Sequence, residues 1–159
     1  RGAGIIPSAP PKIATPDEAF SAFSSGSKFL DEFARESYDD AAYAKPGTLT
    51  FTVPFTRDQT VIWMYAWCAT TTEILNQNFQ NIELEFVLNG VEIPLDQLRT
   101  DDLSAGGQQC RLYYTALSKW TPGEHHLTVT ATFTKAINDG KSDYDAGNYV
   151  MDFTVYMRP

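Results

Sequence analysis

Residues 126–133 read HLTVTATF, in which polar residues alternate with Leu127, Val129, Ala131 and Phe133. Successive side chains of a β-strand point to opposite faces of its sheet, so this period of two predicts a strand with one buried face. Six further segments are predicted to be strands: residues 49–55, 60–69, 82–88, 91–93, 110–116 and 149–157. Asn89-Gly90 joins two of them in a strong hairpin signal, and the polar residues 99–109 are expected to be a loop. Seven such strands, mostly antiparallel, predict an all-β sandwich of two sheets.

The composition excludes several classes of protein. The chain has 159 residues, 43% of them hydrophobic, which predicts one domain with a buried core rather than a disordered chain. No apolar run approaches the roughly 20 residues of a membrane-spanning helix. With 12 Lys+Arg against 20 Asp+Glu, the net charge is −8, and the basic residues are scattered singly. A phosphate backbone selects for clustered basic residues, so no nucleic-acid partner is expected.

The N-terminal part of the chain is predicted to differ from the sandwich. Residues 1–16, RGAGIIPSAPPKIATP, contain four prolines and should form an extended arm. Thr15 and Pro16 are typical of a helix start, and apolar residues at helical spacing follow them. Residues 17–45 are therefore predicted to be a helical elaboration that packs on the sandwich, and residues 46–159 to be the sandwich domain itself.

The arm carries three apolar side chains, Ala3, Ile5 and Ile6, in a segment too rich in proline to fold on itself. Subunits that polymerise by donating a strand place such an arm in the sheet edge or groove of a partner. A flexible linker is the alternative interpretation.

The two cysteines, Cys68 and Cys110, each lie in an apolar, strand-like run. A disulfide between neighbouring strands would fit these positions, and closing its loop would contribute about 3–4 kcal/mol. Two buried free thiols in a cytosolic protein are the alternative. The disulfide, the Thr- and Tyr-rich strands and the proline-rich arm together favour a secreted or cell-surface protein.

The C-terminal part of the chain carries a family resemblance. The residues concerned are Trp120, Pro122-Gly123-Glu124-His125, residues 127–131, Asp145-Ala146-Gly147-Asn148-Tyr149 and residues 151–156. They resemble the closing strands of immunoglobulin-like domains in bacterial cell-surface or secreted proteins. The resemblance covers the C-terminal quarter of the chain and implies an immunoglobulin-like β-sandwich, although the Cys–Cys spacing is short for the inter-sheet bridge of antibody-type domains. A resemblance of fold carries little information about function.

Residues 60–69, TVIWMYAWCA, are apolar on both faces and should be covered on both sides. Strand parity places Trp63, Tyr65 and Trp67 on the face opposite Cys68. If the Cys68 face points into the sandwich, the aromatic face forms an apolar patch that needs a cover. The favoured cover is the N-terminal helix, through Phe20, Phe23, Leu30 and Phe33. The alternatives are a neighbouring molecule, or a sugar stacked on the rings as in carbohydrate-binding modules.

The sequence offers no catalytic constellation. The two histidines, His125 and His126, are adjacent in a predicted strand and should point to opposite faces, and no Gly-x-Ser-x-Gly motif occurs. A weak calcium candidate exists in the loop that contains Asp139, Asp143 and Asp145, because hard oxygen ligands suit Ca²⁺. Its Asn-Asp-Gly sequence is also ordinary turn chemistry. Asp101 and Asp102 rank lower, and no other cofactor is expected.

These observations predict a non-enzymatic extracellular structural or interaction module, such as a self-assembling subunit of a surface filament or layer that uses its N-terminal arm. The expected partner is a protein, including copies of the chain itself. The alternative is a carbohydrate-binding module that uses the Trp63, Tyr65 and Trp67 face.

Overall fold

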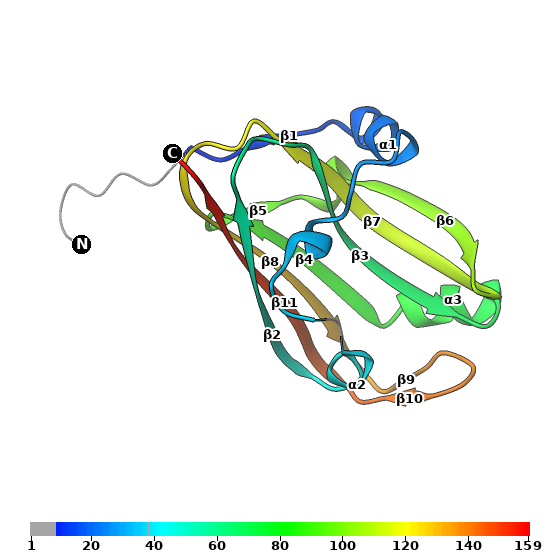
Figure 1. Cartoon of the computed structure of the whole chain (residues 1–159). Helices are drawn as coiled ribbons and strands as arrows, with labels where there is room; N and C mark the ends of the chain where they lie inside the picture. Colours follow the sequence, from blue (N-terminus) through cyan, green and yellow to red (C-terminus); the bar gives the residue numbers. More distant parts are fainter. Residues whose placement is uncertain (1–8, 38) are drawn as a thin grey trace.

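The computed structural model describes residues 9–37 and 39–159, which form two packed β-sheets with short helices around them (Figure 1). The larger sheet has the strand order β2-β11-β8-β4-β5. Its strands are β2 (Gly47–Phe55), β11 (Gly147–Met157), β8 (Gly123–Phe133), β4 (Ile82–Leu88) and β5 (Val91–Ile93). The smaller sheet is centred on β7, which pairs with β3 along one edge and with β6 and β1 along the other. Its strands are β7 (Gln108–Ser118), β3 (Val61–Ala69), β6 (Arg99–Ala105) and β1 (Lys12–Ile13).

All seven predicted strands are present, and the all-β sandwich is confirmed. One pairing between the long strands is parallel: β11 runs beside β2 from Tyr149 opposite Gly47 to Met157 opposite Phe55. A short ribbon of β9 (Ile137–Asn138) and β10 (Asp143–Tyr144) lies at the end of the sandwich near α2 (Asp40–Tyr43), as Figure 1 shows.

Residues 99–109 are not the loop that was expected. They contain β6 and a tight turn at Gly106 and Gly107, both of which have positive φ. Polar side chains dominate β6, and its carboxylates pair with arginines: Asp101 lies 3.1 Å from Arg99, and Asp102 lies 2.7 Å from Arg111 on β7. The strand therefore shows no apolar alternation. The helix α3 (Thr72–Phe79) was not anticipated either, although the Thr71 side chain caps it by accepting the Ile74 N–H at 3.2 Å.

The helix α1 (Pro16–Ser24) begins where the sequence predicts. The Thr15 hydroxyl accepts the Glu18 N–H at 3.2 Å, and the Glu18 carboxylate accepts the Thr15 N–H at 2.9 Å, which is a complete capping box. A 3-10 helix, η1 (Leu30–Phe33), and the short α2 follow. Within residues 9–37 and 39–159, none of the helices has the length and apolarity needed to cross a bilayer.

Apolar side chains form two cores on the two faces of the smaller sheet. The main core lies between the sheets and includes Trp63, Phe86, Val129, Phe153 and Leu30. The second core lies between α1 and the outer face of the smaller sheet. Its buried members are Ala19, Ile62, Cys110, Leu112, Tyr114 and Ala116. The prediction that residues 60–69 are covered on both sides is therefore correct.

Candidate binding site between the sheets

The aromatic face of β3 points into the sandwich. Trp63 and Tyr65 are only 1% and 7% exposed. The Trp63 ring meets Phe86 of the opposite sheet edge-on, with 5.1 Å between ring centroids, and Trp67 meets Phe133 in the same way at 5.2 Å. Trp63 and Tyr65 thus offer no exposed platform for sugar stacking, so the alternative of an exposed row formed by Trp63, Tyr65 and Trp67 is wrong. The sequence placed these three aromatic residues correctly on one face of β3, opposite Cys68. Because both faces of β3 are apolar, the sequence did not show which face meets the other sheet.

The helix α1 covers the opposite face of β3 and β7, so the expectation that Phe20 and Phe23 cover the aromatic row is wrong. Phe23 packs against Tyr114 with ring centroids 5.2 Å apart, on the side that carries Cys110. Phe20 remains 42% exposed and lies under the Arg99 guanidinium, 4.4 Å from its carbon. Leu30 and Phe33, which come after α1, are the two of the four expected covering residues that join the main core, as that expectation required.

The predicted disulfide is confirmed. Cys68 and Cys110 lie directly opposite each other on β3 and β7, with an S–S distance of 2.06 Å and a Cα–Cα distance of 4.0 Å. The bond lies on the outer face of the smaller sheet, in the core under α1. A disulfide in this position is compatible with an oxidising environment.

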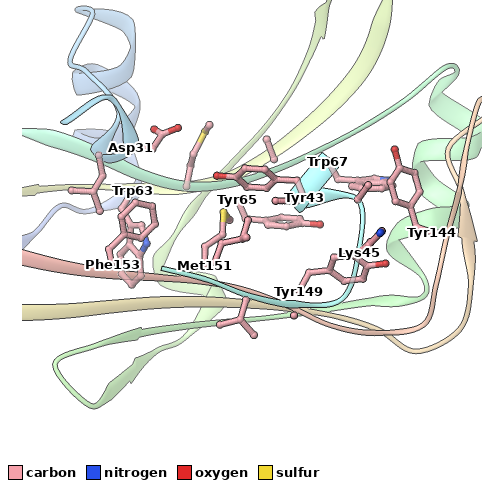
Figure 2. Close-up of a pocket in the computed structure, with 18 of the residues that line it drawn as sticks. Asp31, Tyr43, Lys45, Trp63, Tyr65, Trp67, Tyr144, Tyr149, Met151 and Phe153 are labelled. Carbon is pink, nitrogen blue, oxygen red and sulfur yellow. The ribbon is translucent and has the colours of Figure 1, made fainter. Parts of the chain in front are cut away.

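A cavity of about 410 Å³ opens where β3 of one sheet faces β2 and β11 of the other. Figure 2 shows Trp63, Tyr65 and Trp67 approaching from β3, with Tyr149, Met151 and Phe153 of β11 across from them. The remaining wall comes from the segment between α1 and β2, which contributes Leu30, Asp31 and the four residues 42–45. An apolar cavity of about 150 Å³ is already large enough to bind benzene, so this one has room for several aliphatic side chains.

The cavity follows the edge of β3 rather than one of its faces. All six residues from Ile62 to Trp67 line it. Because consecutive side chains alternate between faces, a cavity that touches six in a row must border the backbone at the strand's edge. This edge is opposite the one that pairs with β7.

The β3 edge is closed at both ends and open in the middle. The Ile62 N–H donates to the Lys28 carbonyl at 2.8 Å, and the Thr70 N–H donates to the Asp139 carbonyl at 2.9 Å. Backbone groups in a strand alternate in direction, so those of Met64, Ala66 and Cys68 point to the same side. Within the part of the chain that the structure describes, no segment pairs with these three residues there.

The cavity is mostly apolar, and its phenols are uncharged at neutral pH. Desolvation, together with the charge of Asp31, raises the pKa of Tyr43 to about 12. Burial also raises the pKa of Tyr65 and that of Tyr149. Desolvation of its carboxyl raises the pKa of Asp31, although the residue as a whole is exposed. A neutral, apolar occupant suits this lining better than a charged one.

The calcium candidate is not assembled into a site. The Asp139 carboxylate accepts the N–H groups of Lys141 and Ser142 and the Tyr144 hydroxyl, which stabilises the β9–β10 turn. Asp143 accepts from the Asn138 amide at 2.8 Å. In the described ranges, no three His, Cys, Asp or Glu side chains gather as metal ligands would. Asp101 and Asp102 are likewise occupied by Arg99 and Arg111.

The adjacent histidines point to opposite faces, as predicted. His125 is fully buried, with one ring nitrogen 3.0 Å from the Asn89 amide and the other 2.8 Å from the Thr121 carbonyl. His126 is exposed and lies 2.6 Å from Glu124. The ring of His125 is thus held by structural contacts on both sides.

The apolar arm residues Ala3, Ile5 and Ile6 lie outside the described residues. The first described residue is Ala9, whose carbonyl accepts a hydrogen bond from the Thr121 hydroxyl, and β1 then pairs with the last residues of β7.

Several residues that line the cavity, such as Tyr43, Lys45 and Met151, were not singled out from the sequence, because only the folded chain brings these segments together.

No protein-family model matches the chain, and no curated protein matches it. Among solved structures, it is similar to the Plasmodium falciparum protein Pf12p, with 7% sequence identity and a TM-score of 0.37. The match covers 70% of this chain and 42% of that chain, so the chain spans less than half the length of that protein. A similarity this weak carries no functional argument.

Proposed function

We propose that this chain is a non-enzymatic, extracellular interaction module that receives an extended segment of another protein chain along the open edge of β3. The observation that carries the proposal is the apolar cavity of about 410 Å³ that borders this edge. The disulfide supports an extracellular setting, since such bonds are rare in the cytosol.

Recognition by strand addition requires two features on the receiving protein. Backbone hydrogen-bonding groups at a sheet edge supply affinity, and pockets for alternate side chains supply specificity. Met64, Ala66 and Cys68 offer the first feature, and the cavity beneath Tyr65 and Trp67 offers the second. The closed ends at Ile62 and Thr70 limit the added strand to a short one.

A strand-forming peptide tests the proposal. An acetylated and amidated hexapeptide of alternating valine and threonine is titrated into the ¹⁵N-labelled full chain and followed by NMR. We expect the largest amide shift changes at residues 64–68 and slower hydrogen exchange at the Ala66 amide, because that N–H acquires a partner. If millimolar peptide leaves these amides unchanged, the proposal is wrong.

The matched variants are Ala66→Pro and Ala66→Ser. Proline removes the N–H that points away from β7. That N–H has no partner in the sheet, so the substitution should leave the fold intact. Serine keeps the N–H at the same exposed position. We expect the proline variant to lose peptide binding and the serine variant to retain it, with the same thermal unfolding midpoint in both.

A further inference from the structure

We propose that the segment received at the β3 edge is the N-terminal arm of a second copy of this chain, with residues 3–6 alongside β3. This inference rests on the proposed function and names its partner. The chain would then associate head to tail, each copy giving its arm to the next.

The chemistry of residues 3–6 matches the edge. The sequence AGII has no proline and no charge, so each of its residues is able to pair with β3, and Pro7 ends the pairing. From Met64 to Cys68 the edge is about 13 Å long, which accommodates a strand of four or five residues.

A strand placed there would meet the cavity on one face and the border of the second core on the other, which suits adjacent isoleucines. One of Ile5 and Ile6 would enter the cavity beside Tyr65, where most of the lining is apolar. The other would lie over the outer face of β3 beside Met64, a half-buried member of the second core. A strand buried on both faces has a continuous apolar run rather than an alternating one.

A chain cannot place this segment in its own edge. Ile6 lies three residues before Ala9, so it reaches no more than about 11 Å from it. Ala9 lies next to Thr121 on the β1 side of the smaller sheet. The order β1-β7-β3 puts the open edge three strand spacings away, about 14 Å across the sheet, before any distance along the strands is counted. The donor must therefore be another copy.

The first strand of the described chain, β1, and the far end of the cavity lie toward opposite ends of the sandwich. β1 pairs with Leu117 and Ser118 at one end of β7, whereas the cavity reaches Tyr144 of β10 and Tyr43 of α2 near the other end (Figure 1). Copies that each pass the arm to the next form rings or filaments, whereas two copies that exchange arms with each other form a closed two-fold dimer. The head-to-tail arrangement therefore predicts species larger than a dimer at high concentration.

Sedimentation velocity of the full chain at rising concentration tests the inference. We expect the wild type to exceed the 17.7 kDa monomer mass increasingly with concentration. The double variant Ile5→Asp with Ile6→Asp should stay monomeric, since one carboxylate would enter the mostly apolar cavity and the other would lie against Met64 on the outer face of β3. The control Gly2→Asp with Ser8→Asp adds the same charge outside residues 3–6 and should still associate.

Mixing two defective variants provides the decisive measurement. Ala66→Pro retains the arm but lacks the receiving edge, and Ile5→Asp with Ile6→Asp retains the edge but lacks the arm. Each should be monomeric alone, and their equimolar mixture should form a one-to-one complex that does not grow. If the mixture stays monomeric, or if both charge variants lose association equally, the inference is wrong.

The two proposals fail in distinguishable ways. A wild type that is monomeric at every concentration but binds the valine–threonine peptide at residues 64–68 overturns self-association and leaves the interaction module standing, with a different protein as its partner. A wild type that neither associates nor binds the peptide overturns both.

Discussion

At the scale of single residues, a few positions hold strained or buried contacts on which the fold depends. Gly140 is one of them: it has a φ of +99°, and a Cβ added there would overlap the Thr70 side chain. Thr70 in turn donates its N–H to Asp139, which closes one end of the β3 edge. The glycine therefore allows the β9–β10 turn to approach β3.

We expect Gly140→Ala to lower the free energy of unfolding by more than 2 kcal/mol, because about 1–3 kcal/mol of backbone strain adds to the overlap with Thr70. Gly107→Ala is the matched control, since Gly107 has a φ of +79° and no neighbouring atom within 4 Å. Chemical denaturation of both variants measures the difference. Equal losses would show that Thr70 moves aside without penalty.

The ion pair between Asp102 and Arg111 predicts a pH dependence. Two hydrogen bonds from the Arg111 guanidinium, at 2.7 and 2.9 Å, lower the pKa of Asp102 below its usual value of 3.8. A lowered pKa in the folded state stabilises the protein above the unfolded-state pKa, and this contribution is lost as the pH falls through the folded-state pKa.

We expect Asp102→Asn to reduce stability at pH 7 by up to about 1 kcal/mol, because the pair is partly exposed, and to have less effect as the pH falls below about 4. Urea unfolding at both pH values measures this, with the exposed Asp96→Asn as the control. A stability difference that is constant with pH would contradict the assigned role of the pair.

At the scale of secondary-structure elements, β3 organises the molecule because both of its faces and one of its edges are in use. Trp63 and Tyr65 face the larger sheet, Ile62 faces α1, and β7 pairs along its length. The remaining edge is the open one. Edge strands of this kind are usually blocked by charge, proline or a covering segment, and here residues 28–29 cover one end and Asp139 covers the other.

The face that α1 covers is testable with two phenylalanines of the same helix. Phe23 is half-buried against Tyr114, whereas Phe20 is exposed under Arg99. We expect Phe23→Ala to reduce the free energy of unfolding by about 1–3 kcal/mol and Phe20→Ala by less than about 1 kcal/mol. Thermal and urea unfolding measure both. A larger loss for Phe20→Ala would place the other face of α1 against the sheet.

At the scale of the whole molecule, the net charge of −8 opposes association between copies, while the proposed contact is apolar and made through the backbone. Like charges on neighbouring copies repel, and salt screens that repulsion over about 10 Å at 0.1 M ionic strength and about 3 Å at 1 M. Apolar contacts do not weaken as this screening increases.

We therefore expect the association constant of the wild type to rise between 0.05 and 0.5 M NaCl, on the order of several-fold. Sedimentation equilibrium at both salt concentrations measures it, and the Ile5→Asp with Ile6→Asp variant should remain monomeric in each. Association that weakens with salt would indicate an ionic contact in place of the strand exchange.

Much of the fold follows from local patterns in the chain. Alternating residues such as those at 127–133 identify a strand with one buried face, because period two matches the pleat. Thr15 and Glu18 identify the start of α1 through a capping box that four consecutive residues complete. Cys68 and Cys110 pair because both lie in strands, and strand pairing brings them opposite each other.

The candidate site depended on information that local patterns lack. β3 is apolar on both faces, so its period does not distinguish the side that meets the larger sheet from the side that meets α1. β6 is held by arginine–carboxylate pairs and shows no apolar period. The cavity joins β3 to β11 and to residues 30–45, segments that meet only once the two sheets pack. The strands with an apolar period, the start of α1 and the disulfide partners are thus determined along the chain. The open edge and its cavity arise from how the sheets stack, because burial is a property of the packed molecule.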